Sequence, residues 1–384
     1  MGMNRAADSV RRRRRRRAAA IAVGAASVVL IGTATTVGIA LAGGGAAPLP
    51  TRTAAAAETP TPTPTPTPLS PAEQLLADSD DPDACAVSFT GEGIDLDPMI
   101  QTSGALYHAL PIPPRDGLVF AGWYATAEDA AAYAVPQRIN GADMVACTDR
   151  QQTLHAAWKT PEEVAALDVG VPILMYHQFT TKPEGESGWL RGNFAYIGDF
   201  DAHMAYLADN DVYLPTWDEL SAFIDGRLFI PKICVIVTDD DGDATWTNLA
   251  APVVEKHKIL STSFVITSAY PGPAPNPYVI QRSHTHDMHT AGANGQGRMV
   301  NWTADEIAAD MERSVDVLGG VREVMAYPFG HHNETSKEGL RRAGFEMART
   351  VEWGYVRVGA DKLALPTVRI NYGMGLPDFM AIIN

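Results

Sequence analysis

The amino-acid sequence predicts an α/β protein in which a distorted (β/α) barrel follows an N-terminal membrane segment and a small β-rich module. Three observations support this prediction. An uncharged apolar stretch lies near the N-terminus, short alternating runs follow a Pro-rich tract, and strand-like and helix-like runs then alternate to the end of the chain. The predicted segments are 1–17 (basic), 18–42 (membrane), 43–81 (linker), 82–159 (β-rich module) and 164–384 (barrel).

The formal net charge of −15 is unevenly distributed along the 384 residues. Residues 1–70 hold nine arginines and two acids, a balance of +7, which leaves −22 for the remainder. A body this acidic repels phosphate backbones, which argues against nucleic acid as a partner. With 46% hydrophobic and 20% charged residues, the chain as a whole is globular rather than disordered.

The N-terminal segment predicts export. Seven consecutive arginines directly precede residues 18–42, which carry no charge. About 20 apolar residues span a bilayer core, and flanking arginines stay in the cytoplasm, so the rest of the chain should lie outside. Its length favours an uncleaved anchor, whereas the small residues Ala40 and Ala42 favour a signal peptide cleaved after Ala42. Both interpretations predict an extracytoplasmic body; the N-terminal segment makes the membrane a partner when it is retained, and the body is secreted when it is cleaved.

The linker and the module are predicted to place the barrel rather than to do chemistry. Pro alternates with Thr over residues 59–68, which favours an extended, stiff spacer. Within 82–159, CAVSF, VFAGWY and MVACT are strand-like runs. The stretch from LPIPPRDGLVFAGWY to TLHAAW resembles the Listeria/Bacteroides-type cell-surface repeat, and this resemblance implies a β-grasp-like spacer or adhesion module.

The three cysteines have different predicted states. Cys85 and Cys147 lie near the first and last strands of the module and are a candidate disulfide in an oxidising exterior. Cys234 lies in the apolar run KICVIVT, which predicts a buried strand and an inert thiol.

Residues 164–384 alternate between two patterns. VPILMYH, KICVIVTDD, STSFVIT, EVMAYPF and EMARTV are short apolar runs, several of them continuous, as in strands covered on both faces. Between them lie stretches such as FDAHMAYLADN and ADEIAADMERSVDVLGG, with apolar spacings of three and four. This repetition predicts parallel strands, and about 220 residues fit a barrel.

Two polar clusters each follow a predicted strand. Asp239, Asp240, Asp241 and Asp243 crowd one strand end, where their charges repel unless a cation neutralises them. The second cluster, SHTHDMH, holds three histidines: His284, His286 and His289. Two imidazoles and one carboxylate suit Zn, Fe, Co or Ni. Either cluster alone also fits a solvated loop; together they predict a metal site.

Four segments taken in order carry a family resemblance: VPILMYHQF, VIVTDDDGDATW, RSHTHDMH and MAYPFGHHNETSKEGLRRAGFEMART. They are similar to the polysaccharide deacetylases with a NodB-homology domain, carbohydrate esterase family four, and most similar to the poly-N-acetylglucosamine deacetylase-like branch. The similarity covers residues 171–384. It implies a distorted α/β barrel and metal-dependent removal of N-acetyl groups from a cell-envelope or extracellular polysaccharide that contains N-acetylglucosamine.

The resemblance assigns roles to the two clusters. Asp240 takes the place of the catalytic base, and Asp241, His284 and His289 those of the metal ligands, with zinc the first candidate and Fe, Co or Ni the others. Asp239 stands where the family usually has Phe.

The spacing of the histidines departs from many relatives. They place the second histidine at the position of Met288, whereas the branch this chain resembles most spaces its two ligands five apart. His286 is therefore a spare, with a ligand swap left open.

The resemblance also suggests residues for the acetyl site, the oxyanion and the general acid. In AYPFG, Tyr327 and Phe329 are expected to wall the acetyl site and the Phe329 N–H to donate to the oxyanion, but the arginine that positions the base in many relatives is missing. His177 is the expected general acid, against the alternative of a hydrogen-bonded strand-end histidine. His331 and His332 are weaker rim candidates, and Trp246 and Trp353 are candidate faces for sugar rings.

Two other functions compete with N-deacetylation. The same chemistry would cleave O-acetyl esters of a glycan such as acetylated xylan. A surface glycan-binding protein without catalysis is the other alternative. The missing arginine and Asp239 favour it, whereas the retained aspartate pair and the two histidines argue against it.

Overall fold

The computed structural model describes residues 68–383, and Leu69–Asn384 form one compact unit. The predicted segments 1–17 and 18–42 and most of the linker lie outside the described residues. Across 68–383, the helices are all too short or too polar to cross a bilayer.

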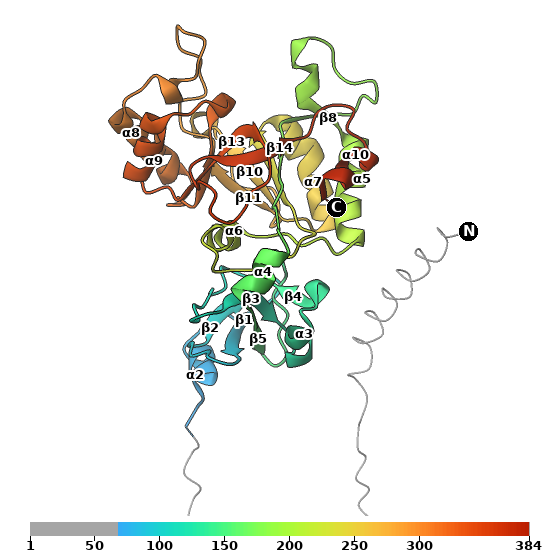
Figure 1. Ribbon diagram of the computed structural model, residues 1–384, viewed down its shortest axis with the longest axis vertical. Coiled ribbons are helices and arrows are strands. Elements are labelled where there is room, and N and C mark those ends of the chain that lie inside the picture. Colours follow the sequence, from blue (N-terminus) through green and yellow to red (C-terminus); the bar gives the residue numbers. More distant parts are fainter. Residues whose placement is uncertain (1–67, 384) are drawn as a thin grey trace, which may run out of the picture. The chain divides into compact units, whose positions relative to one another are not determined.

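The first part of this unit is a five-stranded sheet of order β2-β1-β5-β3-β4 (Figure 1). β1 and β5 are parallel, and the other neighbours are antiparallel. One predicted strand, MVACT, is wrong: Met144 bridges to Leu106 and Thr148 to Gln151, so the run bends between two partners. The elements are α2 (Pro71–Ala77), β1 (Ala84–Thr90), β2 (Met99–Thr102), β3 (Val119–Tyr124), α3 (Ala127–Ala132), η1 (Val135–Gln137), β4 (Arg138–Ile139) and β5 (Gln151–Lys159).

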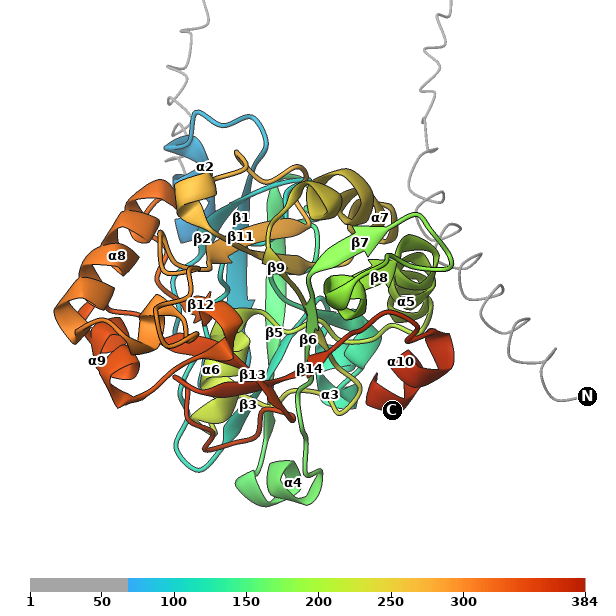
Figure 2. The same cartoon turned by 90° about the horizontal axis from the view of Figure 1, so that it is seen from above.

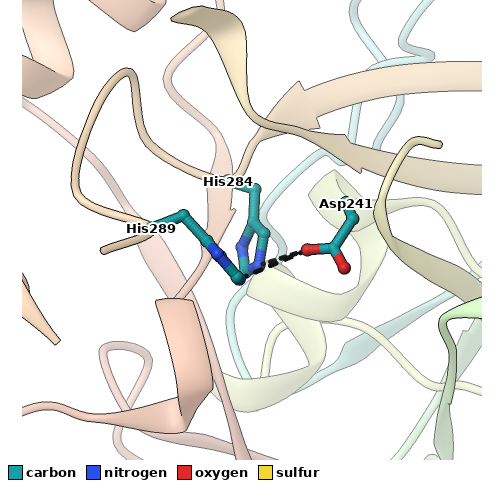
Figure 3. Close-up of side chains that lie close together, drawn as sticks. All are labelled: Asp241, His284 and His289. Atoms are coloured by element: carbon teal, nitrogen blue, oxygen red, sulfur yellow. Dashed lines mark ion pairs between the residues drawn. The ribbon is translucent and has the colours of Figure 1, made fainter. Parts of the chain in front are cut away.

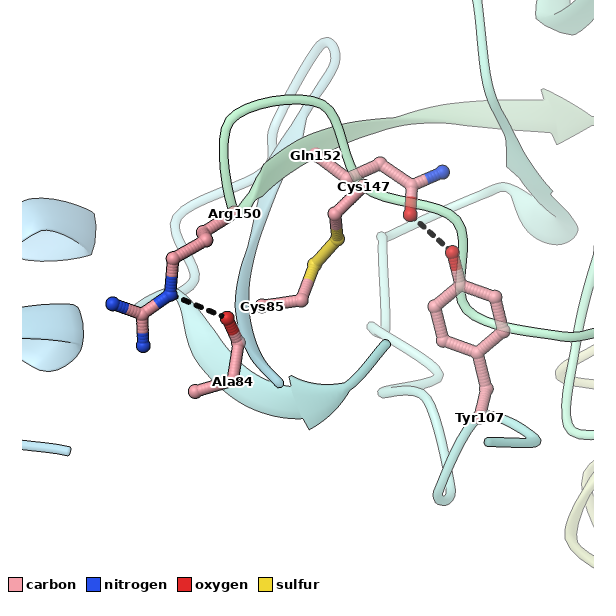
Figure 4. The surroundings of a disulfide bond; sticks show 6 residues. All are labelled: Ala84, Cys85, Tyr107, Cys147, Arg150 and Gln152. Carbon is pink, nitrogen blue, oxygen red and sulfur yellow. Dashed lines mark hydrogen bonds between the residues drawn. A yellow bond between two sulfur atoms is a disulfide. The ribbon is translucent and has the colours of Figure 1, made fainter. Parts of the chain in front are cut away.

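A disulfide joins Cys85 on β1 to Cys147, with the two Cα atoms 6.2 Å apart (Figure 4). Close by, the Arg150 Nε donates to the Ala84 carbonyl at 3.1 Å. The predicted pairing is therefore confirmed, and it closes a loop of 62 residues in a part of the chain with a small core. Cys234 is buried and free, as predicted.

The second part is a closed barrel of seven parallel strands, of order β10-β11-β12-β13-β14-β6-β9 (Figure 2). The strands β6, β9, β10 and β12 are buried over all or nearly all of their length, which explains their continuous apolar runs. The prediction of an α/β barrel is confirmed. The strands are β6 (Ile173–Tyr176), β9 (Ile236–Asp241), β10 (Ser261–Val265), β11 (Val279–Ser283), β12 (Val324–Ala326), β13 (Met347–Trp353) and β14 (Leu365–Arg369).

Helices and a small two-stranded sheet complete the barrel domain. Several helices begin at side-chain caps: Thr303 and Glu306, for example, form a capping box on α8. The elements are α4 (Pro161–Ala166), β7 (Gln178–Thr180), η2 (Trp189–Asn193), β8 (Phe194–Tyr196), α5 (Ile197–Asp209), α6 (Trp217–Ile224), η3 (Trp246–Ala250), α7 (Ala251–His257), η4 (Thr267–Ala269), η5 (Arg298–Val300), α8 (Ala304–Val317), η6 (Pro328–Gly330), α9 (Glu334–Arg342) and α10 (Leu376–Ile383).

The five-stranded sheet is joined to the barrel by a buried polar contact. Arg138 on β4 donates to the Phe229 carbonyl at 2.7 Å and to Glu219 at 3.2 Å, and its guanidinium lies 4.5 Å from the centre of the Tyr213 ring. Asn140 donates to the other Glu219 oxygen at 2.6 Å. Tyr213 bridges to Cys234, two residues before β9, so the contact lies near the start of that strand.

Candidate active site

The carboxylates of β9 lie where the strand leaves the barrel. Asp239 and Asp240 are buried, and the side chain of Asp241 is about one-fifth exposed. Asp241 has a φ of 74°, which breaks the alternation of the strand and re-aims its carboxylate. Gly242 follows with a φ of 60°, and a Cβ there would lie 2.6 Å from Val265 Cγ1, so this turn requires glycine.

Two histidines from the loop after β11 meet Asp241. The His284 Nε2 lies 3.5 Å and the His289 Nε2 3.3 Å from Asp241 Oδ1 (Figure 3). His284 Nδ1 donates to the Ala326 carbonyl at 2.9 Å, which leaves Nε2 as the acceptor nitrogen. Burial lowers the pKa of His284 to about 4, so the ring is neutral at pH 7.

This donor set fits a divalent metal ion. One ligand atom from each of Asp241, His284 and His289 lies within 4.8 Å of the others. Ligands bound tetrahedrally at about 2.0–2.1 Å are about 3.3–3.4 Å apart, close to the two separations from Asp241. Asp241 Oδ1 is buried and lacks a hydrogen-bond donor among the described residues.

Met288 explains the spacing of the histidines. Its side chain is fully buried in a core cluster with Met299, Met311 and Met325. A histidine at this position would bury its imidazole in that core, away from the donor set. His286 points elsewhere, since its Nδ1 hydrogen-bonds Thr267 Oγ1 at 3.1 Å, and it is not part of the cluster.

Asp240 lies between a histidine and an arginine. His177 Nε2 is 3.6 Å from Asp240 Oδ2, and the guanidinium of Arg349 contacts Oδ1. Burial lowers the pKa of His177 to about 3, so the imidazole is neutral at pH 7 and holds no proton in advance for a leaving group. Burial also lowers the pKa of Arg349 to about 9, which leaves the guanidinium charged.

Arg349 corrects the sequence interpretation. The arginine absent from AYPFG is replaced by one from β13, in the run EMARTV. Its side chain is fully buried and also donates to the Thr350 carbonyl at 3.2 Å. A charged residue inside an apolar strand run was the available signal, because burial of an arginine requires a partner. This removes one of the two arguments for a protein without catalysis.

A second residue missed in the sequence is Gln178, whose Nε2 donates to Asp241 Oδ2 at 3.2 Å. Asp239, by contrast, does not join the cluster: it is fully buried, 3.4 Å from the Ser263 hydroxyl. The pKa of Asp239 is raised well above the usual value, mainly because the carboxyl group is buried. The nearby charges of Asp241 and Asp243 raise it further. Burial therefore favours the neutral form of the Asp239 carboxyl group.

Two predicted substrate contacts are wrong. Trp246 is 2% exposed and packs against Phe179 and Phe200, so it offers no face to a sugar. Tyr327 is fully buried, and its hydroxyl donates to the Leu363 carbonyl at 3.0 Å, so it cannot wall an open site. Both side chains lie in buried hydrophobic clusters.

The other rim residues are accessible. Phe329 is 43% exposed, has a φ of 58°, and its ring centre lies 4.4 Å from that of His289. Trp353, at the end of β13, is 75% exposed. His331 Nδ1 accepts from the Gly297 N–H at 3.0 Å, and the His332 ring stacks on Tyr327, so neither belongs to the donor set.

Part of the barrel matches a known protein family. Residues 230–348 match the sequence model of the family described as polysaccharide deacetylase. This match places a polysaccharide deacetylase domain in the barrel part of the chain and supports a hydrolase of the deacetylase type.

The individual proteins that resemble this chain share about a quarter of its residues over the matched region. YxkH of Bacillus subtilis, which carries the provisional name polysaccharide deacetylase, is 25% identical over 240 residues, 59% of this chain and 80% of that protein. The poly-beta-1,6-N-acetyl-D-glucosamine N-deacetylase of Staphylococcus aureus (strain MRSA252) is 24% identical over 193 residues, 45% of this chain and 66% of that enzyme. The match thus spans just under two thirds of the staphylococcal enzyme.

Solved structures were also compared with the chain. Deacetylase PplD of Streptococcus pyogenes has a TM-score of 0.48 and 21% identity, over 56% of this chain and 99% of that one. IcaB from Ammonifex degensii has a TM-score of 0.46 and 22% identity, over 56% and 96%.

Proposed function

We propose that the protein is a metal-dependent N-deacetylase of a cell-envelope or extracellular polysaccharide that contains N-acetylglucosamine. The observation that carries the proposal is the juxtaposition of the donor set Asp241, His284 and His289 with the buried pair of Asp240 and Arg349. The name of the staphylococcal relative supports the choice of glycan. An O-acetyl esterase has no comparable support.

The donor set would hold the cofactor. A divalent ion bound there, zinc as first candidate and Fe, Co or Ni as others, would supply Lewis acidity toward the acetyl carbonyl and toward water. His284 is prepared for this role, because its Nδ1–H is fixed by the Ala326 carbonyl and its Nε2 faces Asp241.

Asp240 is the proposed general base. Its carboxylate accepts a proton from the attacking water, and the guanidinium of Arg349, which contacts that carboxylate, orients it. The Phe329 N–H is proposed to donate to the developing oxyanion.

His177 is the proposed general acid. Because it is neutral before the reaction, it must receive its proton during turnover, and Asp240 lies 3.6 Å away as the source. The protonated imidazole would then donate to the departing amine, which releases acetate and a glucosamine unit.

The location proposed for the protein rests on its N-terminal sequence and on the disulfide. We propose an extracytoplasmic body, anchored through residues 18–42 or secreted after cleavage at Ala42. The Cys85–Cys147 disulfide supports an oxidising compartment. The five-stranded sheet would then serve as the surface spacer or adhesion module that its sequence resembles.

The function is tested by incubating the purified protein with acetylated β-1,6- and β-1,4-linked glucosamine oligomers and with acetylated xylan. We expect acetate and free amine in equal amounts from at least one amide substrate. Acetate from xylan alone would replace the proposal with an esterase, and no acetate from any substrate would favour a binding protein.

A further inference from the structure

The loop that carries both histidine donors is held from behind by one buried carboxylate. Asp310 on α8 is fully buried. Its Oδ1 accepts the backbone N–H of His286 at 2.8 Å, and its Oδ2 accepts that of Asp287 at 2.9 Å. Both amides lie between His284 and His289, so Asp310 contacts the connecting backbone and neither donor ring.

This connecting backbone needs support. Thr285, between His284 and His286, has a φ of 71°, a conformation that a β-branched residue rarely adopts. Its hydroxyl accepts the Met288 N–H at 3.2 Å, and its own N–H donates to Ser283 Oγ at 3.0 Å. A strained loop persists only where the surrounding contacts determine it, and Asp310 provides two of these contacts.

Helix α8 makes the carboxylate a rigid support. The helix starts at a capping box, and Met311 and Val315 fix it in the core. One turn after Asp310, Ser314 hydrogen-bonds Ser283 at 2.7 Å, at the end of β11. The helix therefore holds both the start of the loop and its middle.

We propose that Asp310 is a positioning residue that fixes the separation of His284 and His289 and thereby sets the affinity of the site for its metal ion. The inference rests on the metal site of the proposed function. An asparagine could accept only one of the two amides and would turn its NH₂ group toward the other N–H. The loop would then lose one charge-assisted bond and leave one amide opposed by a donor.

The test compares Asp310→Asn with Asp316→Asn, the same substitution at an exposed position of the same helix. Zn²⁺ affinity is measured on metal-stripped full-length protein by competition with a chromophoric chelator. Hydrogen exchange of the peptide that covers residues 284–289 is measured on metal-free protein. We expect Asp310→Asn to bind Zn²⁺ about 10- to 100-fold more weakly and to exchange this peptide faster, and Asp316→Asn to match the wild type in both.

The readouts separate the inference from the proposed function. A wild type without Zn²⁺ affinity would sink the metal site, while the exchange rates would still report whether Asp310 orders the loop. Unchanged affinity and exchange in Asp310→Asn would overturn the inference, as would a lower melting temperature with wild-type affinity. If the asparagine variant does not fold, Asp310→Glu, which keeps both acceptor oxygens, should bind Zn²⁺ more weakly than the wild type, and wild-type affinity there would overturn the inference.

Discussion

Two buried arginines lie in two regions of the molecule that differ in how completely their polar groups are hydrogen-bonded. Arg138 joins the five-stranded sheet to the barrel through a carbonyl, a carboxylate and an aromatic ring, and only its Nε lacks a partner. Its carboxylate partner Glu219 is itself bonded by Asn140 and by Tyr213. Arg349 instead contacts the carboxylate of Asp240 at the opposite end of β9.

Near Arg349, several buried polar atoms lack hydrogen-bond partners among the described residues. In the part of the chain that the structure describes, His177 Nδ1, Gln178 Oε1 and Asp241 Oδ1 are buried without hydrogen-bond partners. Buried polar atoms are normally satisfied, so a cluster of exceptions at one end of a barrel indicates where ligands bind. The polar contact at the sheet is thus nearly satisfied within the protein, whereas the cluster at the strand ends keeps buried polar atoms without partners among the described residues.

The largest expected effect is the loss of activity when Asp240 is replaced, because this carboxylate is the proposed base and not a metal ligand. Asp240→Asn should lower the rate of acetate release by about 10²- to 10⁴-fold, because the amide cannot accept the proton from water. Metal content should stay at the wild-type value, since Asp240 is not in the donor set. Kinetics and metal analysis on the same preparation check both, and undiminished turnover would remove Asp240 as the base.

The matched substitutions Arg138→Met and Arg349→Met test the comparison directly. Arg138→Met leaves Glu219 without its cation and should lower the free energy of unfolding by about 3 kcal/mol, with kcat unchanged. Arg349→Met should lower kcat by about tenfold or more, because the base loses the group that orients it. Denaturant titrations and acetate release measure the two effects. Equal losses of kcat in both variants would show that the two regions are not independent.

The smallest expected effect concerns Trp353. Because this ring is 75% exposed, Trp353→Ala should change the free energy of unfolding by at most about 0.5 kcal/mol. If the ring stacks on a sugar, KM for a polymeric substrate should rise a few-fold while kcat stays constant. An unchanged KM for both short and long oligomers would exclude Trp353 from the binding surface.

The sequence predicted the barrel and the two polar clusters because these depend on local patterns. Continuous apolar runs mark strands covered on both faces. The two clusters lie at the C-terminal ends of the parallel strands β9 and β11, which meet at one edge of the barrel. Burial within the tertiary structure was harder to predict. The apolar run around Arg349 signals burial but not which group it contacts, and nothing local shows that Trp246 packs inward. The arginine beside Asp240 was therefore missed, and a core tryptophan was taken for a sugar-binding face.

The spacing of the histidines shows the same limit. That Met288 fills a core behind the loop, and that Asp310 holds the loop from a helix more than 20 residues away, follows only from packing. Family resemblance was needed to select His284 and His289 over His286 before any geometry was known.

The most direct test of the central claim is removal and return of the metal. The protein is stripped with a chelator, assayed for acetate release, and titrated with Zn²⁺, with His289→Ala carried through in parallel. We predict that the stripped wild type is inactive, that activity returns in proportion to bound Zn²⁺ and saturates at one ion per chain, and that His289→Ala recovers little. Full acetate release by metal-free protein, or equal recovery by His289→Ala, would contradict the account.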